Sequence, residues 1–321
     1  MENQTVTSIK PAWTLGDSLA LPLMLGGNVF GWTADRAASF AVLDRFADAG
    51  GTLIDTADYY AAWVPGNSGG ESERMIGEWL AATGRRQEVT IATKVGLLAG
   101  PAGNGLSAAR IIEAADESLN RLQIDVIDIY FAHVDDRDTP LEESLAAFDA
   151  LVRQGKVRML GASNFTAERL AEALRIADVN GFHRFQVIEP KYNLAIRNSY
   201  EGPLQQLALA EKLAVVPFYG LGGGYLTGKY RSAADIVGTP RETWLRPYVD
   251  GSGPAILEAM DAIAAETGLS LPDMAMAWLR EKPGILAPIA SATSAGQIDA
   301  LIAGCNVHLT PEQRERLDLA I

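Results

Sequence analysis

The stretch GTLIDTADYY at residues 51–60, followed by EVTIATKVG at residues 88–96, decides the fold of this chain. In each part a short apolar run leads to an ionisable residue: Asp55 in the first part, with Tyr60 five positions later, and Lys94 in the second. Apolar runs of this length are typical of buried parallel strands. The polar residues are therefore expected where strands end and loops begin.

A third apolar run, residues 126–132, ends at His133. Ligands bind α/β folds at the edge of the sheet where parallel strands end. Each polar residue alone has an ordinary explanation, since a tyrosine usually packs, a lysine is usually solvated and a histidine is usually structural. Their occurrence at three successive strand ends favours a catalytic site. Tyr59 is the rival to Tyr60, and the spacing from Asp55 favours Tyr60.

The rest of the chain repeats this alternation of strand and helix. Expected strands cover residues 23–25, 53–55, 89–93, 126–132, 157–161, 185–188, 214–218 and 285–289. Expected helices cover residues 35–49, 71–82, 107–122, 140–154, 166–177, 202–211, 254–267, 272–280 and 294–303, with a last helix capped by Thr310. Eight such units without a linker predict an α/β protein with one (β/α)8 TIM barrel domain over residues 1–321.

A doubly wound sheet remains the alternative, because alternation alone does not close a barrel. Two additions to the barrel are expected. A β-hairpin across residues 13–21 precedes the first strand. A long irregular loop, from residue 220 to about residue 253, follows the seventh strand. A long segment of this kind inside a compact domain is usually functional, so it is expected to close over a bound ligand.

Composition excludes several classes of protein. The 321 residues carry a net charge of −13, so the surface is expected to repel nucleic acid and anionic membranes. No apolar run is long enough to span a bilayer, and residues 1–11 lack the apolar core of a signal peptide. The single cysteine, Cys305, permits no intramolecular disulfide, which fits a cytoplasmic protein. Three widely spaced histidines argue against a His/Cys metal site.

Five motifs resemble the aldo-keto reductase family and occur in that family's order, from about residue 23 to about residue 301. They are Asp55-Thr56-Ala57 with Tyr60, Ala92-Thr93-Lys94, Asp128-Ile129-Tyr130 up to His133, Gly161-Ala162-Ser163-Asn164-Phe165 and Leu226-Thr227-Gly228-Lys229-Tyr230. The resemblance implies a (β/α)8 barrel and reversible hydride transfer between a nicotinamide and a carbonyl carbon. Dinucleotide binding in this family needs no Gly-x-Gly-x-x-Gly motif, and none follows the first strand here.

The resemblance makes Tyr60 the acid/base that exchanges a proton with the carbonyl oxygen. A tyrosine has an ordinary pKa of roughly 10, and a nearby ammonium is expected to lower it. Lys94 would supply that ammonium, and Asp55 would pair with Lys94 and hold it in place. His133 would donate a hydrogen bond to the same oxygen and orient the substrate.

The resemblance also implies a cofactor site at the barrel rim. Its expected residues are Asp55, Ser163, Asn164, Glu189, Phe218, Tyr219, Gly220, Leu221, Gly222, Gly223, Lys229, Ser291, Thr293 and Gln297. Ser163 and Asn164 would bind the nicotinamide carboxamide, Phe218 would stack on the ring, and the glycines would approach the pyrophosphate. Ser291, Thr293 and Gln297 would bind the adenosine end.

Two positions of this site depart from the family pattern. Glu189 stands where the family usually has a glutamine, and a carboxylate can accept a hydrogen bond from the carboxamide but cannot donate one. Its negative charge would also favour the oxidised nicotinamide. Thr293 stands where an arginine often binds the 2′-phosphate. NADP(H) is the expected cofactor, and the missing arginine keeps NAD(H) open.

The substrate is expected to be a small carbonyl or alcohol. Trp32 and Trp63 would wall a mostly apolar pocket beside His133, which suits aldehydes and ketones. The leading function is an NAD(P)H-dependent aldo-keto reductase, acting as a carbonyl reductase or alcohol dehydrogenase. One alternative is a cofactor-sensing regulatory subunit with weak reductase activity. Another is a lyase or isomerase in which Tyr60 and Lys94 act without hydride transfer.

Overall fold

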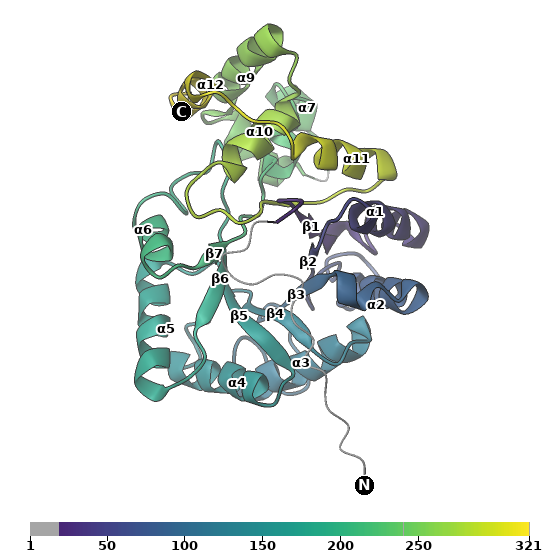
Figure 1. The fold of residues 1–321 in the computed structure, drawn as a ribbon, viewed down its shortest axis with the longest axis vertical. Coiled ribbons are helices and arrows are strands. Elements are labelled where there is room, and N and C mark those ends of the chain that lie inside the picture. Colours follow the sequence, from purple (N-terminus) through teal and green to yellow (C-terminus); the bar gives the residue numbers. More distant parts are fainter. Residues whose placement is uncertain (1–18, 240, 321) are drawn as a thin grey trace.

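The computed structural model describes residues 19–239 and 241–320, which form an α/β fold with a parallel sheet at its centre (Figure 1). The strands are β1 (Met24–Gly26), β2 (Leu53–Asp55), β3 (Thr90–Val95), β4 (Ile127–Ala132), β5 (Val157–Ser163), β6 (Phe185–Glu189), β7 (Ala214–Val215) and β8 (Ile289–Ala290). They lie in the order β7-β6-β5-β4-β3-β2-β1-β8. Consecutive strands are therefore neighbours, and the last strand returns to lie beside the first.

Helices connect the strands and surround the sheet. They are α1 (Arg36–Asp48), α2 (Glu71–Thr83), α3 (Ala108–Leu122), α4 (Leu141–Arg153), α5 (Ala167–Asn180), α6 (Pro203–Ala210), α7 (Ala233–Ile236), α8 (Glu242–Val249), α9 (Gly253–Thr267), α10 (Leu271–Arg280), α11 (Ala295–Gly304) and α12 (Pro311–Asp318). Short 3-10 helices cover η1 (Gly27–Val29), η2 (Arg85–Glu88) and η3 (Gly222–Thr227). Local capping begins several helices, since Asp35, Thr166 and Ser294 each accept a backbone N–H three residues on.

The sheet is curled, and backbone bonds bring its two edges together. The N–H of Leu286 donates to the carbonyl of Val215 in β7 at 2.8 Å, and the N–H of Ile289 in β8 donates to Pro217 at the same distance. On the other side, Met24 of β1 pairs with Ile289. This arrangement is consistent with a (β/α)8 barrel, and the sheet order does not fit the doubly wound alternative.

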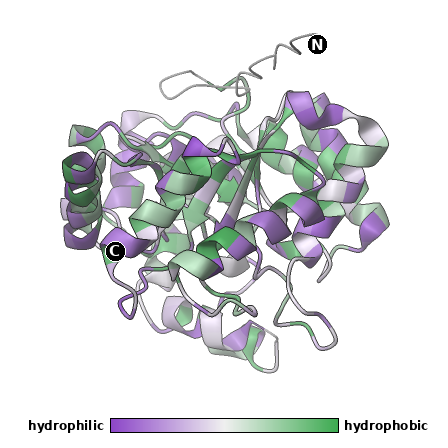
Figure 2. Ribbon diagram, turned by 90° about the horizontal axis from the view of Figure 1, so that it is seen from below, coloured by the Kyte–Doolittle hydropathy of each residue, from purple (hydrophilic) through white to green (hydrophobic). Residues whose placement is uncertain are grey.

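Apolar side chains fill both faces of the sheet. One buried cluster, which includes Met24, Leu53, Phe131 and Val187, lies on its inner face. A larger cluster packs between the strands and the surrounding helices. Figure 2 shows mostly hydrophobic strands (green) at the centre, surrounded by helices that carry both hydrophobic and hydrophilic (purple) residues. Gly161 of β5 has a packing role here, because a Cβ at that position would clash with the ring of Phe131.

Three expected details differ from the structure or lie outside it. Residues 13–18 of the predicted hairpin lie outside the described residues, and residues 19–21 form no strand. The eighth strand, predicted at residues 285–289, is Ile289–Ala290. Ile285 forms only an isolated parallel bridge with Val215 of β7, and Pro288, which lies between the two, has no N–H to donate. Residues 220–253 are not simply irregular, since η3, α7 and α8 lie within them.

The described part of the chain contains no helix that is both long enough and apolar enough to cross a membrane.

Candidate active site

The carboxyl ends of neighbouring strands bring the predicted polar residues together. Asp55 is the last residue of β2, Lys94 is the penultimate residue of β3, and His133 directly follows β4. Ser163 and Glu189 end β5 and β6 and pair with each other in the sheet. The order of the strands thus places these side chains at one edge of the sheet.

Lys94 is the centre of this group, and its side chain is completely buried. Its ammonium donates to Asp55 Oδ1, to the carbonyl oxygen of Thr56 at 3.0 Å and to the Tyr60 hydroxyl at 2.8 Å. The Tyr60 hydroxyl in turn donates to Asp55 Oδ2 at 3.1 Å. An ammonium has three N–H groups, so these three acceptors use all of them.

Charge and burial set the protonation of this group. Burial lowers the pKa of Lys94, but the charge of Asp55, followed by smaller effects that include its hydrogen bond to Lys94, raises that pKa above its ordinary value, so Lys94 is an ammonium. Burial and the Asp55 carboxylate raise the pKa of Tyr60 well above 10. Lys94 lowers the pKa of Tyr60 as expected, but the other two effects are larger. Tyr60 is therefore a protonated phenol that carries a proton to give, but its net pKa is raised, whereas the sequence predicts a lowered one.

His133 completes the catalytic group that the sequence predicts. Its ring lies 5.9 Å from the Tyr60 ring in an edge-to-face arrangement. Burial and the nearby Lys94 ammonium hold the pKa of His133 well below its usual range. Nδ1 of this ring is buried and has no hydrogen-bond partner among the described residues. A neutral imidazole beside Tyr60 can donate one hydrogen bond to a substrate oxygen.

The predicted substrate residues form an aromatic wall next to Tyr60. The Trp63 ring lies 6.3 Å from the Tyr60 ring and 5.5 Å from the Trp32 ring, both edge-to-face. Trp63 is more than a third exposed. These rings extend from Tyr60 to the surface, at the place where the sequence predicts a mostly apolar pocket.

Ser163 and Asn164 lie beside His133, but their side chains already have partners. The Ser163 hydroxyl donates to the Glu189 carbonyl at 3.0 Å, and the Asn164 amide donates to the His133 carbonyl at 2.9 Å. Asn164 adopts a positive φ of 61°, a conformation that asparagine tolerates better than most residues. The pair thus ties the ends of β4, β5 and β6 together.

The turn after β7 has the shape expected of a loop that binds an anion. Tyr219 has φ of 68°, and Gly222, Gly223 and Gly224 also have positive φ, which side chains other than glycine rarely adopt. Phe218 packs against the inner cluster of the sheet. Asn193 fixes the turn by donating to the Tyr219 carbonyl at 2.9 Å. Gly220 and Leu221 lie within the same turn.

Three cations lie at this turn, and sequence reasoning identified one of them. Lys229 was predicted, and a Cβ on Gly224 would lie 3.2 Å from its Nζ. Arg241 was missed, although its Nη1 donates to the Gly223 carbonyl at 2.9 Å. Lys191, also missed, lies with its ammonium 4.6 Å from the Tyr219 ring centre. No local pattern marks Arg241 or Lys191, so only the folded chain reveals them.

The predicted adenosine residues lie together after β8, at the start of α11. Gln297 accepts hydrogen bonds from the Thr293 backbone N–H at 2.9 Å and from the Thr293 hydroxyl at 3.1 Å. The Ser291 hydroxyl donates to the Asn28 side chain at 2.5 Å. Gly26 leaves room for this contact, since a Cβ there would lie 2.6 Å from the Ser291 hydroxyl. Sequence reasoning did not identify Asn28.

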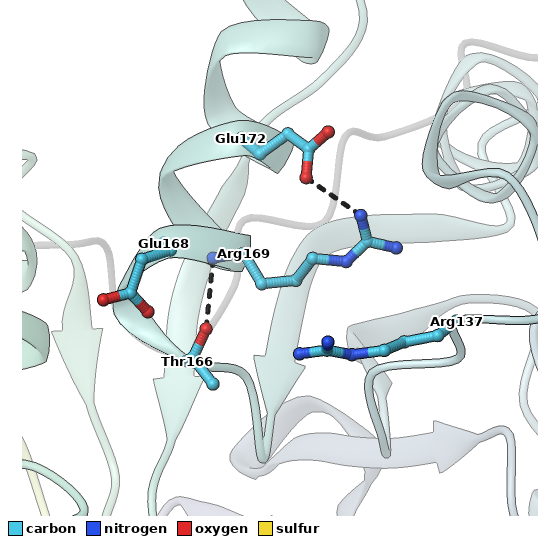
Figure 3. A pocket seen from close by; sticks show the side chains of 5 residues that line it. All are labelled: Arg137, Thr166, Glu168, Arg169 and Glu172. Atoms are coloured by element: carbon cyan, nitrogen blue, oxygen red, sulfur yellow. Dashed lines mark hydrogen bonds and ion pairs between the residues drawn. The ribbon is translucent and has the colours of Figure 1, made fainter.

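A surface pocket of about 330 Å³ lies elsewhere, beside the first turns of α5 (Figure 3). Its lining residues are Arg137, Thr166, Glu168, Arg169 and Glu172. Figure 3 shows the two arginine side chains lying near each other, with Arg169 bonded to Glu172 at 2.9 Å. Its lining carries charges of both signs, unlike the mostly apolar pocket that the sequence predicts, and it includes none of the predicted site residues.

Comparison with known proteins places these observations in a family. The sequence model described as "Aldo/keto reductase family" matches residues 22–321. Norsolorinic acid reductase stcV of Emericella nidulans is 30% identical over 313 residues, covering 91% of this chain and 76% of its own. A probable voltage-gated potassium channel subunit beta of Oryza sativa is 29% identical, covering 91% and 90%. An aryl-alcohol dehydrogenase [NADP(+)] of Phanerodontia chrysosporium is 28% identical, covering 92% and 81%.

Proposed function

This chain belongs to the aldo/keto reductase family, and we propose that it is an NADP(H)-dependent oxidoreductase that interconverts a carbonyl and an alcohol, with Tyr60 as the acid/base. The observation that carries the proposal is the buried hydrogen-bonded group of Asp55, Tyr60 and Lys94 beside a neutral His133. Relatives named as a reductase and a dehydrogenase support the same class of reaction.

The arrangement suits proton transfer to a carbonyl oxygen. A bound reduced nicotinamide would supply the hydride to the carbonyl carbon. Tyr60 is protonated, so its hydroxyl can give a proton to the oxygen as negative charge develops there. Lys94, 2.8 Å from that hydroxyl, stabilises the phenolate that remains. His133 donates a hydrogen bond to the same oxygen and fixes its position.

The described residues fit a dinucleotide. Two buried polar atoms, His133 Nδ1 and Glu189 Oε2, have no partner within the described ranges, and both belong to the strand ends around Lys94. In the left-handed glycine turn at residues 222–224, the N–H groups of Gly222 and Gly224 already donate to the carbonyls of Tyr219 and Leu221. The Gly223 N–H has no backbone acceptor among the described residues and could donate to a phosphate oxygen. Lys229 and Arg241 add positive charge at this turn in a chain whose net charge is −13.

We prefer NADP(H) to NAD(H) because members of this family commonly use NADP(H), and because the Phanerodontia relative is named as an NADP(+) enzyme. Thr293 and Gln297 bond to each other, and the N-terminus of α11 lies next to them. Helix N-termini bind phosphate through free N–H groups. We also propose that the chain forms one domain. In this proposal, residues 220–253 close over the bound ligand.

A substitution of His133 tests the orienting role. His133→Ala is expected to lower kcat/KM for bulky ketones by about 10²–10³-fold, the effect of losing one donor to a developing oxyanion. The kcat/KM for reactive quinones should fall less, because their reduction depends less on an oriented hydrogen-bond donor. Steady-state kinetics with both substrate classes measures the difference, and equal losses would remove the orienting role.

Turnover with a panel of aldehydes, ketones and secondary alcohols tests the proposed function itself. Steady consumption of NADPH with at least one carbonyl is the expected result. NADPH binding without turnover of any carbonyl would instead favour the regulatory alternative, which the name of the rice relative suggests.

A further inference from the structure

Glu189 is a second carboxylate on the catalytic lysine. Its Oε2 lies 3.5 Å from Lys94 Nζ, and its side chain is only 3% exposed. The three N–H groups of Lys94 are used by Asp55, Thr56 and Tyr60. Glu189 Oε2 is therefore buried without a hydrogen-bond partner in the described part of the chain.

An ionised carboxylate in this position is unfavourable. A buried charge without hydrogen bonds is costly, and the Asp55 carboxylate already neutralises the Lys94 ammonium. The flanking strands offer no further charge. Ser163 of β5, which pairs with Glu189, donates only to the Glu189 backbone carbonyl, and β7 pairs through Ala214 and Val215 with Val187 and Ile188. Burial and Asp55 raise the pKa of Glu189 well above its usual range, against the opposing effect of Lys94.

We propose that Glu189 is the proton store of the active site: it is protonated when the cofactor is reduced and ionised when the cofactor is oxidised. This inference rests on the proposed function. Hydride transfer takes place next to Tyr60, and Lys94 joins Tyr60 to Glu189 through contacts of 2.8 and 3.5 Å. An oxidised nicotinamide there adds one positive charge, which the ionised Glu189 balances.

The proton balance of carbonyl reduction follows from these contacts. The carbonyl carbon gains a hydride, and its oxygen gains the proton of Tyr60. Tyr60 recovers a proton from the Lys94 ammonium, and Lys94 recovers one from the Glu189 carboxyl group. The products are the alcohol, the oxidised cofactor and the Glu189 carboxylate, while Tyr60 and Lys94 end as they began. Glu189 takes a proton from solvent after the oxidised cofactor leaves.

Proton release on cofactor binding tests this inference without turnover. The wild-type protein is mixed with NADP+ or NADPH, and with NAD+ or NADH in parallel, in weakly buffered solution containing a pH indicator. Nicotinamide binding is followed separately by protein fluorescence. NADP+ is expected to release up to about one proton per bound molecule, and NADPH none, because only the oxidised form favours an ionised Glu189. NADP+ that binds without releasing a proton overturns the inference and leaves the proposed function standing.

Two variants identify the source of the proton. Glu189→Gln keeps the size of the side chain but cannot titrate, so its proton release should vanish and its affinity for NADP+ relative to NADPH should fall by about tenfold or more. Asp58→Asn is the matched control. Burial and Glu73 raise the pKa of this second buried carboxyl group to about 8, but the closest cation to its side chain is Arg110, at 3.6 Å. Its release should equal that of the wild type.

Two results with these variants would overturn the inference. One is undiminished proton release in Glu189→Gln, and the other is an equal change in its NADP+ and NADPH affinities. If no dinucleotide binds to the wild type, the proposed function fails and this inference fails with it.

Discussion

Replacement of Tyr60 by phenylalanine is expected to abolish carbonyl reduction while cofactor binding stays nearly unchanged. The variant loses the hydroxyl that accepts from Lys94 at 2.8 Å and donates to Asp55 at 3.1 Å, but it keeps the aromatic ring beside Trp63 and His133. Loss of a general acid lowers the rate by about 10²–10⁴-fold. The measurement is kcat/KM for an aldehyde that the wild-type protein reduces, together with the dissociation constant for NADPH.

The neighbouring tyrosine provides the matched control for this prediction. Tyr59→Phe removes a hydroxyl one residue away, and the Tyr59 ring also lies near Trp63, with 5.8 Å between the centroids. It should keep most of the activity because no contact joins its hydroxyl to Lys94. If Tyr60→Phe retains normal turnover, Tyr60 has no part in the reaction. If Tyr59→Phe is the inactive variant, the acid/base has been assigned to the wrong tyrosine.

Replacement of Lys94 by methionine is expected to lower both activity and stability. Without the ammonium, nothing stabilises the Tyr60 phenolate, so reduction should fall by a factor similar to that of Tyr60→Phe. The Asp55 carboxylate would remain buried without its cation, which destabilises a fold by about 3–5 kcal/mol. Denaturant unfolding and steady-state kinetics on the same preparation measure the two effects.

A double variant separates the two losses. Adding Asp55→Asn to Lys94→Met removes the unpaired charge, so stability should return towards that of the wild type while activity stays low. Recovery of activity in the double variant would show that the lysine only neutralises Asp55. A single Lys94→Met variant as stable as the wild type would contradict the buried ion pair as described here.

The catalytic group could be predicted because its signals are local. Asp55, Lys94 and His133 each stand at or next to the end of a short apolar run, and parallel strands bring such ends to one edge of a sheet. Tyr60 follows Asp55 by a fixed spacing within one loop. The regular alternation of strands and helices likewise predicted the sheet, since each unit is visible in its own segment of sequence.

The remaining features depend on contacts between distant segments. Asn28 and Ser291 meet only because β8 lies beside β1. Arg241, which directly precedes α8, bonds to Gly223 across a separation of 18 residues. The orientation of Glu189 is a similar case. Its position at the end of β6 suggested a contact with the cofactor. Its carboxylate also lies against Lys94, which no spacing in the sequence indicates.

Titration of the purified protein with NADPH and NADH, followed by reduced-nicotinamide fluorescence, tests the central claim most directly. The proposal predicts saturable binding of NADPH at one site per chain, tighter than that of NADH. It also predicts that the bound NADPH is oxidised when an aldehyde is added. Tighter binding of NADH would keep the hydride mechanism and assign the preference to Thr293. Binding of neither nucleotide would contradict the proposed function and leave the Tyr60–Lys94 pair for another acid–base reaction.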